Sequence, residues 1–136
     1  MLFYFHFAAT AFMTGIIWFV QLIHYPWFHD VPADRFVAYH QKYTRMMGGL
    51  VGPVMLAELA SGLLLLALMP EARLVLVLSL LLLAIIWLST FALQVPTHHR
   101  LSQGYEISLH RKLVQTNWIR TVAWTARLGL LLFAVR

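Results

Sequence analysis

Four long apolar runs divide the chain, at about residues 2–23, 47–69, 74–93 and 114–135. Each is close to the ~20 residues that an α-helix needs to cross the hydrocarbon core of a membrane. A strand interpretation fails, because a lipid-exposed open sheet would leave backbone groups without hydrogen bonds. The pattern therefore predicts one all-α domain over residues 1–136, an integral membrane four-helix bundle with antiparallel neighbours.

The connections between the runs refine this prediction. Residues 70–73 are so few that they force an antiparallel hairpin between the second and third helices. Pro32 followed by Ala33 is typical of a helix start, so we expect a cytoplasmic extension of the second helix. We expect Pro96 to end the third helix. A short polar segment before Gly104 should follow, and a short helical segment should lead into the fourth helix.

Composition supports the membrane interpretation. Hydrophobic residues make up 61% of the chain and charged residues 11%, against about 45–50% and about 25% in typical soluble domains. A soluble chain of this size could not hide so much apolar surface. The balance excludes a disordered chain, a nucleic-acid-binding surface domain and an ordinary cytosolic enzyme, so membrane lipid is the expected partner. The absence of cysteine excludes disulfides, thiolate metal sites and cysteine nucleophiles.

The net charge of +5 is concentrated in two segments, so it predicts topology rather than nucleic-acid binding. Lysine and arginine are frequent in the first and third connections. The short hairpin and the C-terminus carry only Arg73 and Arg136. The positive-inside rule then places both long connections in the cytoplasm and both termini outside. We expect a multi-pass protein of the plasma membrane, and the sequence leaves open its assembly into homo-oligomers.

Each predicted helix has one polar face. At roughly 100° per residue, the polar and small residues gather within about 80° on the first two helices and about 120° on the fourth. Such faces line the interior of a bundle, where hydroxyl and small residues are typical of helix packing. The inward positions are His6, Thr10, Thr14, Gln21 and His24; His40, Thr44, Gly48, Met55, Glu58 and Gly62; Ser79, Trp87, Thr90, Gln94 and Thr97; and His110, Asn117, Arg120, Thr121, Trp124 and Arg127.

Two of these residues are costly inside a membrane. An ionised side chain at the midplane costs at least ~2.5–3.5 kcal/mol, and Glu58 and Arg127 both lie near the middle of their runs. The second and fourth helices run in the same direction, so the two residues lie at similar depth and we expect an ion pair. The pair either fixes the helix register or forms a charged wall for a polar ligand group.

Six of the seven histidines lie in or beside the two long connections, and His6 alone lies near the opposite end of the first helix. Imidazole suits interfacial hydrogen bonding, proton transfer and metal or haem ligation. No pair has spacing of the HExxH kind, so the sequence predicts no metal site and leaves any cofactor unidentified. His24, His40 and His110 are the best candidates for catalysis, because they lie on the inward faces.

Two segments carry a family resemblance. Residues 94–101 read Gln-Val-Pro-Thr-His-His-Arg-Leu, and residues 113–121 read Leu-Val-Gln-Thr-Asn-Trp-Ile-Arg-Thr. With the four-helix layout, they resemble the small four-span bacterial membrane proteins of unknown function that are related to fungal anthrone oxygenases.

The second segment matches that family's Asn-x-x-Arg-Thr pattern at Asn117, Arg120 and Thr121. In the first segment, Gln94 and His98 stand where the family usually has asparagine. The resemblance implies a bacterial inner-membrane protein. It also implies an oxygenase-like or other redox enzyme that acts on a lipophilic phenol or quinol at the cytoplasmic end of the bundle.

In this hypothesis the three inward histidines, His24, His40 and His110, abstract or relay a proton. Asn117 and Arg120 bind a developing oxyanion, as preorganised donors do. The remaining inward polar residues are predicted to bind the substrate, and these are Gln21, Glu58, Gln94, His98, Trp124 and Arg127.

Two alternatives stay open at this point. A small transporter or channel subunit would use Glu58 as its coupling acid. A non-catalytic membrane accessory or ligand-binding protein would use the same polar faces for assembly or binding, without turnover. Fold alone does not decide among these functions.

Overall fold

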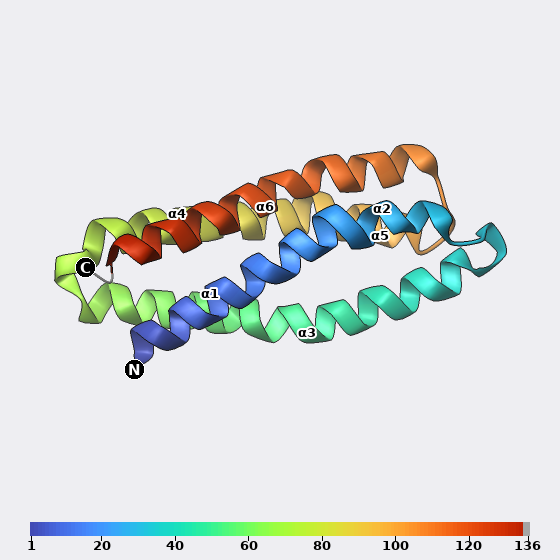
Figure 1. Cartoon of the computed structure of the whole chain (residues 1–136). Helices are drawn as coiled ribbons and strands as arrows, with labels where there is room; N and C mark the ends of the chain where they lie inside the picture. The colour runs from blue at the N-terminus through green and yellow to red at the C-terminus, as the bar shows by residue number, and fades with distance from the viewer. Residues whose placement is uncertain (135–136) are drawn as a thin grey trace.

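The computed structural model describes residues 1–134, and these residues are almost entirely helical with no strand. The all-α prediction is therefore confirmed. Four helical rods run along one another, with α1 packed on α3 and α6, and α4 packed on α3 and α6 (Figure 1). The elements are α1 (Leu2–Phe19), the π-helical turn η1 (Val20–His24), α2 (Tyr25–Trp27), the 3₁₀ turn η2 (Phe28–Asp30), α3 (Ala33–Leu68), the 3₁₀ turn η3 (Pro70–Ala72), α4 (Arg73–Ser89), the π-helical turn η4 (Thr90–Gln94), α5 (Val95–Leu101) and α6 (Ile107–Ala134).

Three of the rods are long and apolar enough to cross a membrane, and they cover Leu2–Asp30, Ala33–Leu68 and Pro70–Leu101. The fourth rod, α6, carries two buried arginines, Arg120 and Arg127. The end that we expected for it, at residue 135, lies outside the described residues. Large apolar side chains are exposed along all four rods, and a surface of this kind suits contact with lipid rather than water.

The connections follow the sequence prediction except at Pro96. Helix α3 begins at Ala33, and η3 makes the short turn at Pro70. Pro96, however, does not end the third helix, which continues as α5 to Leu101. The helical segment expected to lead into the fourth helix is present as the first part of α6, which begins at Ile107, and residues 102–106 form the non-helical connection.

A π-helical turn explains why the helix passes through Pro96. Proline has no N–H, and its ring clashes with the carbonyl four residues earlier in a regular α-helix. The wider π turn η4 precedes Pro96 and relieves this conflict. The first rod has the same arrangement, because the five-residue turn η1 precedes Pro26. Each turn holds one buried glutamine, Gln21 in η1 and Gln94 in η4.

The interior contains many of the polar residues that the sequence pattern places on the inward faces of the helices. Thr10, Thr14, Ser79, Asn117 and Thr121 are buried, among others. The apolar core between them is divided into three clusters along the rods, and the middle one joins Met13, Ile17, Met55, Leu83, Ile86, Ala123 and Trp124. An interior that holds both polar and apolar side chains, inside an apolar exterior, differs from the apolar core and polar surface of a soluble domain.

Candidate functional site

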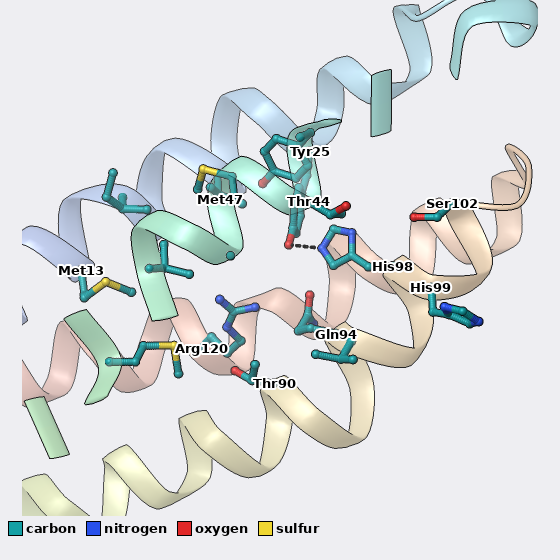
Figure 2. Close-up of a pocket in the computed structure, with 17 residues that line it drawn as sticks. Met13, Tyr25, Thr44, Met47, Thr90, Gln94, His98, His99, Ser102 and Arg120 are labelled. Atoms are coloured by element: carbon teal, nitrogen blue, oxygen red, sulfur yellow. Dashed lines mark hydrogen bonds between the residues drawn. The ribbon is translucent and has the colours of Figure 1, made fainter. Parts of the chain in front are cut away.

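A cavity of about 370 Å³ lies between α1, α3, the η4–α5 segment and α6. One end of it is apolar, with Met13, Val51 and Met55 in its wall. The other end is polar, and Figure 2 shows Tyr25, Thr44, His98 and Ser102 grouped toward it. Apolar pockets with a few convergent polar groups are typical ligand sites, so this cavity is the candidate functional site.

Arg120 is the charged residue of the cavity wall. Its side chain extends from α6 into the space between Met13 and Gln94 (Figure 2), although the residue is only 8% exposed. Its guanidinium interacts with the Tyr25 phenol and lies 5.4 Å from the centre of the Trp124 ring. No carboxylate lies within ion-pair distance of it in the part of the chain that the structure describes.

A continuous chain of hydrogen bonds joins Tyr25 and Ser102, two residues of the cavity wall, through His98 and His40. Tyr25 Oη lies 2.9 Å from His98 Nε2, and His98 Nδ1 lies 3.0 Å from His40 Nε2. His40 Nδ1 in turn lies 2.9 Å from Ser102 Oγ. Each neutral imidazole offers one donor and one acceptor, so the protons of this chain can all point toward Ser102 or all toward Tyr25. The arrangement can therefore pass a proton between Tyr25 and Ser102, the half-exposed residue that begins the connection after α5.

A second group of hydrogen bonds fixes the backbone beneath Tyr25. His110 Nε2 lies 2.7 Å from the Tyr25 carbonyl oxygen, which can only accept, so Nε2 carries the proton and Nδ1 is the acceptor. The Tyr105 hydroxyl, 3.1 Å from that Nδ1, then donates to it. Burial raises the pKa of Tyr105, and this favours the protonated phenol that the bond requires. His110 thus positions Tyr25 rather than lining the cavity.

Two amide side chains tie the first and last rods together beside the cavity. Asn117 Nδ2 donates to Gln21 Oε1 at 2.8 Å, and Gln21 Nε2 donates to the Val114 carbonyl at 3.2 Å. Both amides are buried and neither lines the cavity. Gln94 does line it, and its Nε2 donates to Thr116 Oγ1 at 2.9 Å.

The expected ion pair is present, at some distance along the bundle from the polar end. Arg127 Nη1 lies 2.5 Å from Glu58 Oε1, with both side chains fully buried. Thr10 donates to Glu58 Oε1 at 2.9 Å, and Trp124 Nε1 donates to Glu58 Oε2 at 3.1 Å. Arg127 Nε also donates to Ser79 Oγ at 3.3 Å. None of these residues lines the cavity.

The structure separates the predicted site residues into two groups. Gln94, His98 and Arg120 line the cavity, and His40 lies one hydrogen bond behind its wall. The other predicted site residues do not line the cavity. His24 stacks on Tyr43 with ring centres 4.1 Å apart. The remaining six are hydrogen-bonded between the helices, and these are Gln21, Glu58, His110, Asn117, Trp124 and Arg127.

Sequence reasoning missed four polar residues of the cavity wall, namely Tyr25, Tyr43, His99 and Ser102. Tyr25 follows Gln21 by four residues and so lies one turn further on the same inward face, a signal that was available. Ser102 lies in a non-helical connection, where no periodicity could identify it.

Comparison with protein-family models, curated proteins and solved structures found no match to this chain. The resemblance to relatives of the anthrone oxygenases therefore stays a prediction.

Proposed function

We propose that this chain is a multi-pass plasma-membrane enzyme that binds a lipophilic phenol or quinol in its cavity and oxidises it with molecular oxygen. The four rods cross the membrane, with both termini outside and the polar end of the cavity on the cytoplasmic side. Three apolar rods and the positions of lysine and arginine support this topology.

The observation that carries the proposal is the unpaired state of Arg120. A buried charge is costly unless an opposite charge or strong acceptor meets it. The neighbouring Arg127 has such a partner in Glu58, whereas Arg120 faces the cavity with a phenol and an aromatic ring beside it. A ligand that brings a phenolate or carbonyl oxygen into the cavity supplies the missing acceptor.

The hydrogen-bonded chain supports a proton-transfer step next to that oxygen. The O–H bond of the ligand breaks, and its proton moves to Tyr25 while the Tyr25 proton passes to His98 and the relay continues through His40 to Ser102, whose own hydroxyl proton leaves to water. The resulting oxyanion is held by Arg120. For an anthrone, the electron-rich carbon then reacts with O₂, so that R₂CH₂ + O₂ gives R₂C=O + H₂O. Four electrons leave the carbon and reduce both oxygen atoms.

Glu58 gives little support to the transporter alternative. A coupling acid lines the path of its substrate, but Glu58 is fully buried, accepts three hydrogen bonds and lies outside the cavity wall. The non-catalytic binding alternative uses the same cavity, and turnover distinguishes it from an enzyme.

Oxygen consumption tests the proposal. The purified chain in nanodiscs is incubated with a panel of anthrones and alkyl hydroquinones, and oxygen uptake is recorded with the appearance of the oxidised product. We expect uptake with at least one member of the panel, and its loss in Arg120→Gln but not in Arg111→Gln, which alters an exposed arginine outside the cavity. Binding without uptake across the panel would favour the non-catalytic alternative.

A further inference from the structure

The cavity has a mouth between α3 and the η4–α5 segment. Gly48 on α3 and Val95 on α5 belong to its wall and are exposed to the outside. A Cβ atom placed on Gly48 would have no heavy atom within 4 Å beyond its immediate surroundings. The wall is therefore bare backbone at Gly48, and a molecule of modest width could pass beside it.

The surroundings of the mouth indicate what lies outside it. Exposed apolar side chains border it on the η4–α5 side, at Phe91 and Val95. Exposed basic residues come one to two turns nearer the end of the bundle, and these are Lys42, Arg45 and Arg100. From the membrane interior outward, apolar side chains usually give way to lysine and arginine at the interface. The mouth therefore faces lipid just inside that interface.

The polar and apolar ends of the cavity are oriented in the same way as the two ends of a lipid in the adjoining leaflet. Its apolar end, at Met13 and Met55, lies toward the middle of the rods, and its polar end, at Tyr25 and His98, lies toward the interface. An amphiphile in the adjoining leaflet already has this orientation, with its polar oxygen at the interface and its apolar part toward the bilayer centre.

We propose that the ligand enters sideways from the lipid leaflet through the mouth at Gly48, rather than from water, as a membrane-dissolved amphiphile. Its polar oxygen moves to Arg120 and its apolar part to Met13 and Met55, so the molecule keeps the orientation that it has in the leaflet. This inference rests on the proposed function for the nature of the ligand, but the lipid-facing mouth is a separate property that can be measured alone.

The chain has no cysteine, so single-cysteine variants give an unambiguous test. Gly48→Cys places a thiol in the mouth. Gly49→Cys is its matched control, since a Cβ there also meets open space but Gly49 does not line the cavity. Gln103→Cys marks the exposed connection after α5. Each variant in nanodiscs is treated with an alkyl maleimide that partitions into lipid, or with a charged, water-soluble methanethiosulfonate, with and without anthrone or decyl hydroquinone.

We expect Gly48→Cys and Gly49→Cys to react with the lipid-soluble reagent and only Gln103→Cys to react with the water-soluble one. A probe at ten times its dissociation constant should slow labelling at position 48 roughly tenfold and leave position 49 unchanged. Labelling of position 48 from water at the rate of position 103, or by neither reagent, would overturn the lipid-facing mouth. Labelling from lipid without protection by any probe would leave the mouth standing and count against the proposed function.

Discussion

Arg120 and Arg127 lie two helical turns apart on α6, both buried, and only Arg127 has a carboxylate partner. The same residue type thus occupies two different electrostatic environments on one face of one helix. Arg127 is held in a buried network with Glu58, Thr10 and Ser79. Arg120 is directed into a cavity. The first arrangement is suited to stability and the second to binding, so substitutions at the two sites should have different effects.

Neutralising Glu58 should strongly destabilise the fold. Glu58→Gln leaves the Arg127 charge buried without a counter-charge, and breaking a buried pair in this way typically costs about 3–5 kcal/mol. Unfolding in mixed detergent micelles measures the loss. Glu71→Gln, an exposed acid in η3, should stay within about 0.5 kcal/mol of the wild type, and equal effects of the two substitutions would refute the pairing argument.

Interrupting the hydrogen-bonded chain should slow turnover without weakening binding. His40→Phe keeps a ring stacked near Phe36, whose centre lies 5.3 Å away, but removes both nitrogens of the relay. We expect kcat for anthrone oxidation to fall roughly a hundredfold, the scale of general acid–base catalysis. The dissociation constant should change little, because His40 does not line the cavity.

His29→Asn is the matched control for the relay, since His29 is exposed and bonds to Tyr105 instead. If His40→Phe lowered kcat and affinity in parallel with a loss of thermal stability, His40 would have a packing role only.

Adding one methyl group at Gly62 should loosen the contact between the first three rods. A Cβ there would lie 3.0 Å from Leu80 Cδ2 and 3.1 Å from His6 Cε1, and overpacking of this kind costs about 1–3 kcal/mol. Gly129→Ala, where a Cβ meets open space, should instead be neutral or stabilising. The unfolding temperature should therefore fall for Gly62→Ala and hold or rise for Gly129→Ala, and a neutral Gly62→Ala would show that Leu80 and His6 can move aside for the added methyl group.

Much of the fold follows from the apolar runs and their polar faces. The helix start at Ala33, the turn at Pro70 and the depth match of Glu58 with Arg127 could all be deduced, because each depends on local sequence or on helical periodicity. The passage of the third helix through Pro96 could not. Whether a proline ends a helix or is accommodated by a π turn depends on packing against other rods, which a single run of sequence does not contain.

The candidate site shows the same division. Periodicity identified Arg120, Gln94 and His40 as inward-facing, but inward positions serve both packing and binding. Only the three-dimensional arrangement shows that Asn117 bonds to Gln21 while Arg120 faces a cavity. The cavity itself arises from the separation of α3 and α5, a long-range property of the bundle.

The binding of a matched pair of ligands, an alkylphenol and its methyl ether, shows whether Arg120 recognises the oxygen of the ligand. The dissociation constants of both are measured for the wild type and for Arg120→Gln in nanodiscs. A hydrogen bond to a charged group is worth about 1.5–3 kcal/mol, which corresponds to a preference of roughly tenfold to a hundredfold. We predict that the wild type prefers the phenol by this factor, and that Arg120→Gln loses the preference while unfolding at the same temperature or higher. Equal affinities of the wild type for phenol and ether, or an unchanged preference in Arg120→Gln, would contradict the account.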